Sequence, residues 1–153
     1  MNNIFLAPAI EEPPFLWLME MGGRKVGVNQ VDGWCMLLDD HPIFFNSEER
    51  CALLAPVLEI DEEKFLEFLE NSAISNPIYG EKIRDFPQTA LLKHIFHSSY
   101  SGYWPEKALA WLAIDKVLQQ NFKVELEDFM KNKIMPQRSR QIAKKMLNGL
   151  SHH

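Results

Sequence analysis

The chain has 153 residues, 46% of them hydrophobic and 24% charged, a composition that is typical of a folded globular protein and excludes a disordered or repetitive chain. Its formal net charge is −5, no apolar run approaches the ~20 residues that span a bilayer, and no basic leader precedes Glu11. Its two cysteines, Cys35 and Cys51, form no CxxC pair, which excludes the class of small disulfide-framed secreted domains. We therefore expect one soluble, cytoplasmic globular domain over residues 1–150, without membrane association, and we interpret residues 151–153 as the start of an expression tag.

The first 45 residues give the weakest structural signal. The segment FLWLMEM is compatible with a buried strand or a helical turn, because periodicity does not separate the two in so short a run. The stretches GGRKVGV and DGWCMLLDD have the composition of extended or turn-like chain. A small β element in this region therefore stays open.

Helical signals dominate from Pro42 onward. Ser47 is a candidate N-cap before two glutamates, Asp61 precedes the amphipathic segment EEKFLEFLE, and Thr89 precedes ALLKHIFHSSY. Proline suits the first turn of a helix and glycine its end. The remaining expected helices are residues 105–121, which begin at Pro105 with a wide apolar face, residues 124–134, and residues 136–148, which Gly149 terminates. The sequence thus predicts a mainly α protein, a compact single-domain helical bundle of about five to seven helices.

Charge is unevenly distributed along the chain. All 21 acidic residues lie within residues 1–128 beside ten basic ones, a net charge of −11, whereas six basic residues and no acidic ones follow from Lys131 onward. An acidic body repels nucleic acid and attracts basic proteins. Direct binding of DNA or RNA is therefore not expected, although an amphipathic basic segment over residues 131–147 keeps a nucleic-acid-associated role as an alternative.

Candidate catalytic groups are few. His94 and His97 are three residues apart, so on a helix they would project to one side as half of a metal site or as an acid–base pair. No third ligand follows at a matching spacing, and the common nucleotide, metalloprotease and nucleophile-elbow motifs are absent from the sequence. Cys35 and Cys51 lie in apolar segments typical of inert core thiols. We expect no cofactor, no metal and no enzymatic activity, with a small enzyme that uses His94 and His97 as the alternative.

The stretch HSSYSGYWPEK, residues 97–107, has the chemistry of a tight connection before a helix. Gly102 permits a positive φ, Pro105 presets the next helix, and Pro105 disfavours a helical conformation at Trp104. Its tyrosines, Tyr100 and Tyr103, are candidate anchors for a partner protein, because aromatic residues supply much of the binding energy of interfaces.

The segment YWPEKALAWL at Tyr103–Leu112, together with the acidic helices, resembles the small immunity proteins of bacterial toxin–immunity systems, including contact-dependent growth inhibition. The resemblance implies a cytoplasmic inhibitor that covers the active cleft of a cognate toxin, often a nuclease with a basic surface. An acidic partner of such a toxin gains association rate and selectivity from complementary charge. The predicted partner-binding residues are Asp39, Asp40, Asp61, Glu62, Glu63, Glu67, Glu70, Tyr100 and Tyr103.

Overall fold

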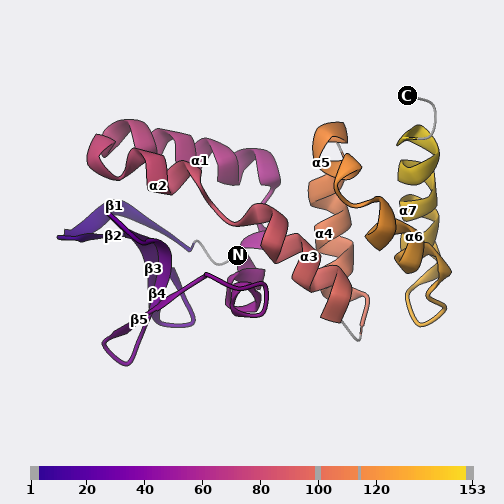
Figure 1. The fold of residues 1–153 in the computed structure, drawn as a ribbon, viewed down its shortest axis with the longest axis horizontal. Coiled ribbons are helices and arrows are strands. Elements are labelled where there is room, and N and C mark those ends of the chain that lie inside the picture. The colour runs from indigo at the N-terminus through magenta and orange to yellow at the C-terminus, as the bar shows by residue number, and fades with distance from the viewer. Residues whose placement is uncertain (1–3, 99–100, 114, 151–153) are drawn as a thin grey trace. The chain divides into compact units, whose positions relative to one another are not determined.

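The computed structural model describes residues 4–98, 101–113 and 115–150 (Figure 1). The chain divides into two compact units, and each is described by itself. Unit 1 comprises residues 1–51 and 63–88, and unit 2 comprises residues 52–62 and 89–153. The expectation of one domain over residues 1–150 stays a prediction, and the supposed tag residues lie outside the described part.

Unit 1 is built on an antiparallel sheet whose strands follow the order of the chain. The strands are β1 (Phe5–Glu12), β2 (Phe15–Met21), β3 (Arg24–Asn29), β4 (Gly33–Leu38) and β5 (His41–Phe44). Gly22 and Gly23 form the two-residue turn between β2 and β3 with positive φ, as tight hairpins require, and Gly33 has positive φ at the start of β4. The prediction of a mainly helical bundle is therefore wrong, because this five-stranded sheet makes the protein a mixed α and β fold.

The sequence did not predict the central strands β2, β3 and β4 because they lack an alternation of apolar and polar residues. Leu16 to Met19 in β2 are all at most 2% exposed, although consecutive residues of a strand point to opposite faces of a sheet. Strands that are buried on both faces appear in the sequence as continuous apolar runs, which resemble a buried helix.

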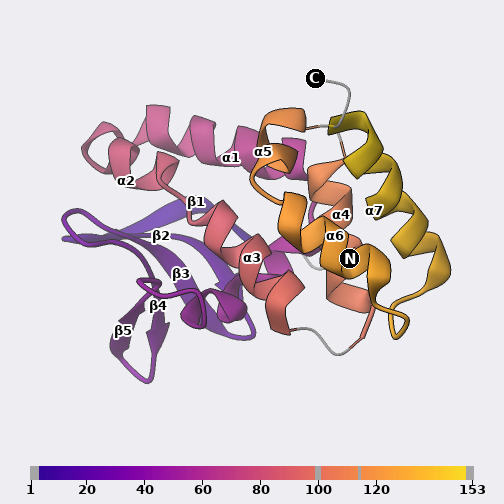
Figure 2. The ribbon, with the colours of Figure 1, turned by 45° about the vertical axis from the view of Figure 1, so that its right-hand side comes forward.

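Helical segments of the same unit cover one face of this sheet, as Figures 1 and 2 show. They are α1 (Glu62–Ser75), the short 3-10 helix η2 (Pro77–Tyr79) and α2 (Gly80–Arg84). The Trp34 indole of β4 donates a hydrogen bond to the Ile83 carbonyl oxygen at 3.3 Å, and its ring packs edge-on against Phe86. The Tyr79 hydroxyl donates to Glu11 at 3.1 Å, so η2 is fixed to the first hairpin.

Unit 2 contains the remaining helices. The 3-10 helix η1 (Arg50–Glu59) leads into it, and α3 (Gln88–Ser98), α4 (Tyr103–Leu112), α5 (Lys116–Gln120), α6 (Lys123–Lys131) and α7 (Gln137–Leu150) follow. Its core includes Trp111, which is 2% exposed and donates from Nε1 to the Ile60 carbonyl oxygen at 2.8 Å. Leu91, Leu112 and Phe122 are fully buried.

Several expected helix boundaries differ from those observed. The helix expected over residues 105–121 ends at Leu112, because Asp115 caps a separate helix α5 by accepting from the Leu118 amide at 2.9 Å. Helix α4 begins at Tyr103, so Trp104 is helical, and Gly149 lies inside α7 instead of ending it. Gly102 has a φ of −80°, and a Cβ there would lie 2.7 Å from the Pro136 ring, so close packing rather than positive φ accounts for this glycine.

Among the described residues, no helix combines the length and the apolar character needed to cross a bilayer.

Candidate protein-binding face

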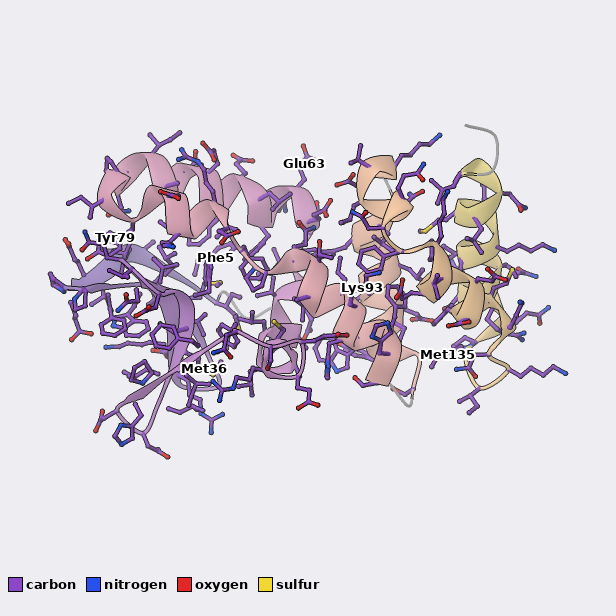
Figure 3. The ribbon with its side chains drawn as sticks, in the orientation of Figure 1. Phe5, Met36, Glu63, Tyr79, Lys93 and Met135 are labelled. Carbon is purple, nitrogen blue, oxygen red and sulfur yellow. The ribbon has the colours of Figure 1, made fainter. Side chains whose placement is uncertain are left out.

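The outer side of α1 carries a continuous row of exposed acidic and apolar side chains. Glu63, Leu66, Glu67, Glu70 and Ile74 are spaced at i, i+3, i+4, i+7 and i+11, which places them on one face of the helix. We call this set the α1 outer face. Leu66 is 40% exposed and Ile74 is 63% exposed, so apolar surface is accessible among the carboxylates. Figure 3 shows the Glu63 side chain directed away from the sheet.

The opposite side of α1 holds the helix in place. Phe65, Leu69 and Ala73 are buried, and the Phe65 ring packs against Phe86 with centroids 4.9 Å apart. Phe68 stacks on Phe5 of β1 at 3.9 Å. This aromatic packing fixes the rotation of α1 about its axis, so the α1 outer face is presented in one orientation.

The electrostatics of unit 1 favour a basic partner. Unit 1 holds thirteen acidic and six basic residues, a formal net charge of −7, whereas unit 2, with eight acidic and ten basic residues, carries +2. Glu70 forms a two-point ion pair with Arg84, at 3.0 and 2.9 Å. The hydrogen bond from Arg84 lowers the pKa of Glu70. Glu63 and Glu67 form no ion pair with any described residue, so their charges are available to a partner.

The other predicted acidic residues do not join this face. Glu62 is only 7% exposed, so its carboxylate offers little accessible charge, and its role in partner binding stays a prediction. Asp61 is exposed but belongs to unit 2. Asp39 and Asp40 form the exposed two-residue turn between β4 and β5, with φ of 48° and 67°, and this hairpin lies away from α1 in both views of unit 1 (Figures 1 and 2).

The predicted aromatic anchors lie in the HSSYSGYWPEK stretch. Tyr103, in unit 2, is 50% exposed, and its hydroxyl donates to Glu59 at 3.2 Å. Partial desolvation, and to a smaller extent the nearby Glu59 carboxylate, raises the pKa of Tyr103. Tyr100 lies outside the described residues. Whether Tyr103 contacts a partner therefore stays a prediction.

The two histidines do not form a joint site. His94 Nε2 lies 3.0 Å from the Ser98 hydroxyl, whereas His97 Nε2 lies 2.9 Å from the Glu125 carboxylate of α6. Lys93 binds the other carboxylate oxygen of Glu125 at 2.9 Å. Across the described residues, no group of three histidine, cysteine or carboxylate side chains is arranged to hold a metal ion.

Burial acts to raise the pKa of Glu125, but the hydrogen bonds from Lys93 and His97 together outweigh it and hold this pKa below its usual value. The carboxylate is therefore charged at neutral pH, and inside unit 2 it makes an ion pair with Lys93 and a hydrogen bond with His97. This cluster ties α3 to α6, which is a structural role and does not require a substrate.

Neither cysteine resembles an activated nucleophile. Both are fully buried. Burial, with a smaller contribution from Asp32, raises the pKa of Cys35 to about 12, and burial likewise raises the pKa of Cys51. A thiol needs a lowered pKa to act as a nucleophile at neutral pH.

Comparisons of this chain with protein-family models, with curated proteins and with solved structures found no match. Its function must therefore be inferred from its own surface.

Proposed function

We propose that this chain is an immunity protein that binds a basic protein toxin through the α1 outer face and neutralises it by covering its active cleft. The observation that carries the proposal is the alternation of Glu63, Leu66, Glu67 and Ile74 on the exposed side of a helix that is firmly packed on its other side. The carboxylates steer a basic partner to this surface, and the apolar side chains supply contact area that loses water on binding.

The proposed toxin is a basic nuclease domain. The active cleft of a nuclease must attract phosphate groups, so it is lined with cations, and an acidic protein can occupy it in place of the nucleic acid. Unit 1, at −7, has the charge that such a cleft selects. The proposed site of action is the cytoplasm.

The test uses the protein encoded by the neighbouring gene as the candidate toxin. We expect the purified chain to bind it, to inhibit its nuclease activity, and to protect cells that express it. The variant E63Q/E67Q should slow association about tenfold at low salt and flatten the salt dependence of the rate. The variant L66A/I74A should mainly accelerate dissociation, because short-range apolar contacts set the lifetime of a complex.

A matched control removes the same charge elsewhere. Glu81 of α2 and Asp128 of α6 are exposed and lie outside the α1 outer face. The variant E81Q/D128N should therefore slow association much less than E63Q/E67Q does. Equal effects of the two charge variants would place the binding site elsewhere, and absence of binding, inhibition and protection would refute the immunity function.

A nucleic-acid-associated role is the second candidate, because unit 2 carries a net charge of +2 and α7 exposes Arg138, Lys144 and Lys145. Arg140 is less accessible and donates from Nε to the Met135 carbonyl oxygen at 3.1 Å. Binding of duplex DNA that weakens steeply with salt, and that K144Q/K145Q reduces, would favour this role over toxin binding.

The enzyme alternative is the weaker one. His97 is hydrogen-bonded to Glu125, and His94 is hydrogen-bonded to Ser98 on its own helix. An acid–base mechanism would need both histidines to reach one substrate. We expect the double variant H94Q/H97Q to retain toxin protection, provided that it folds.

A further inference from the structure

A surface hollow of about 310 Å³ lies in unit 1 beside the edge strand β5. Its residues come from three stretches of the chain: the start of β4, the end of β5 with the residues that follow, and the end of α2 with the residues that follow. The side chains that matter for its chemistry are Trp34, Phe44, Phe45, Asp32, Asp85 and Lys82. We call this hollow the β5 pocket.

The aromatic side chains of the β5 pocket sit on a rigid frame. Trp34 is 5% exposed and is fixed by its hydrogen bond to the Ile83 carbonyl oxygen and by the edge-on contact with Phe86, 5.0 Å between centroids. The Phe45 amide donates to the Trp34 carbonyl oxygen at 3.2 Å, which continues the pairing of β5 with β4. The ring of Phe44 is half-buried. A ligand would therefore meet mainly Phe44 and Phe45, which are partly exposed, with the nearly covered Trp34 as their support.

Two carboxylate side chains, those of Asp32 and Asp85, line the β5 pocket. Asp32 and Asp85 are exposed, and neither forms an ion pair with a described residue. The backbone that carries Asp32 is fixed, because its amide donates to the Asn29 side-chain oxygen at 2.9 Å. The Asp85 amide donates to the Lys82 carbonyl oxygen at 3.2 Å at the end of α2. The backbone that carries both carboxylates is therefore held by hydrogen bonds.

Two cations of unit 1 compete with a positively charged ligand. Lys82 lines the pocket and is half-exposed. Arg50 does not line it, but its Nη1 donates to the Phe44 carbonyl oxygen at 3.3 Å. The Arg50 contact shows that a guanidinium group can already reach the backbone next to this pocket.

We propose that the β5 pocket binds a guanidinium side chain, namely an arginine that the basic protein partner presents. This inference rests on the proposed function, because it names the residue type by which that partner is recognised. A guanidinium stacks flat on aromatic rings, is weakly hydrated, and offers donors to two carboxylates at once. A lysine ammonium is a compact, strongly hydrated charge and gains less from the rings. Arginine is also among the residues that most often anchor an interface in a pocket.

The probe is N-acetyl-argininamide, titrated into the full ¹⁵N-labelled chain and followed by amide chemical shifts. We expect saturable shifts at the amides of Asp32, Gly33, Phe45 and Asp85, with weaker binding of N-acetyl-lysinamide and no binding of N-acetyl-glutaminamide. The variant D85N should weaken argininamide binding about threefold to fivefold, as expected for loss of an exposed charge contact. K82Q should strengthen it about twofold, because a competing cation is removed.

The control variant is E81Q, which removes an exposed carboxylate of α2 outside the pocket and should leave argininamide binding unchanged. Shifts that are spread over the surface, equal binding of the three probes, or a K82Q variant that binds no more tightly than the wild-type chain would overturn the proposal. K82Q and D85N change affinity in opposite directions, so a general loss of folding cannot imitate the expected result.

The two proposals can fail separately. E63Q/E67Q leaves the β5 pocket intact, so it should not alter argininamide binding even if it abolishes binding of the toxin. Loss of the toxin interaction with argininamide binding retained would refute the proposed function alone. Toxin binding that depends on the α1 outer face, without specific argininamide binding, would refute the pocket alone.

Discussion

The buried carboxylate of Glu125 allows a quantitative test of unit 2. Its side chain is 8% exposed and accepts from Lys93 Nζ and His97 Nε2, both at 2.9 Å. The substitution E125Q keeps the shape but removes the charge, and it leaves Lys93, 4.6 Å above the Phe122 ring, without its counter-ion. Breaking a fully buried pair costs about 3–5 kcal/mol, but Lys93 and the half-exposed His97 can regain water, so we expect a loss of about 2–3 kcal/mol.

The loss should depend on pH. The pKa of Glu125 is lower in the folded chain than its usual value, because the hydrogen bonds from Lys93 and His97 outweigh the effect of burial. A carboxylate with a lowered folded pKa contributes its full stability above the unfolded pKa, about 4.3, and loses it as the pH falls through the folded pKa. The stability difference between wild type and E125Q should therefore be complete at about pH 7 and should shrink below about pH 4.

Urea unfolding, followed by tryptophan fluorescence and circular dichroism, measures both effects. The matched control is E127Q on the same helix, where Glu127 pairs with Lys131 at 3.0 Å on the exposed side. An exposed pair of this spacing contributes about 0.3–0.5 kcal/mol. Equal losses for E125Q and E127Q, or a loss for E125Q that does not change with pH, would refute the reasoning.

Three further predictions test the packing. G27A should destabilise the chain by about 3 kcal/mol or more, because a Cβ at Gly27 would collide with the backbone carbonyl oxygen of Leu16 in the neighbouring strand. G149A should stabilise the chain by up to about 1 kcal/mol, because Gly149 lies inside α7 with open space around it. Thermal unfolding of both variants distinguishes these outcomes. W111A should cost about 3–5 kcal/mol in urea unfolding because the indole is 2% exposed, and a cost below about 1 kcal/mol would contradict its burial. Cys35, whose pKa burial raises to about 12, should react with a disulfide reagent at neutral pH only as fast as the chain unfolds, and rapid labelling of the folded chain would contradict this.

Local helix signals predicted several helices well, and long-range contacts decided the rest. Helix α1 follows Asp61 as expected, and α6 and α7 lie close to their predicted ranges. The sheet was not predictable as a sheet, because β2, β3 and β4 are buried on both faces and therefore lack the alternation that marks a strand. The pair Asp39–Asp40 before Pro42 favours a solvent-exposed turn, as observed, but it lacks the asparagine–glycine or aspartate–glycine sequence that would have identified this turn as part of a hairpin.

The α1 outer face was only partly accessible to sequence reasoning. The acidic residues of α1 are evident in the sequence, but the predicted set included Glu62, which is buried in the structure. A signal for this was present, because Glu62 lies three residues before Phe65 and seven before Leu69, on the apolar side of the helix. The same helical spacing places Leu66 and Ile74 among the acids of the opposite side. The full face could therefore have been predicted by treating the acidic and apolar positions of α1 together.

The β5 pocket could not have been predicted from the sequence, because its residues come from distant parts of the chain. Its carboxylates are 53 residues apart in the chain, at Asp32 and Asp85, and only the docking of α2 against the sheet brings them to one hollow.

The charge of the chain also divides differently in the structure than in the sequence. Residues 1–128 carry a net charge of −11, but the negative charge belongs mainly to unit 1, which carries −7, and unit 2 carries +2. A basic partner is therefore attracted mainly to unit 1. Since the α1 outer face and the β5 pocket both belong to unit 1, steering by its charge would favour both contacts at once.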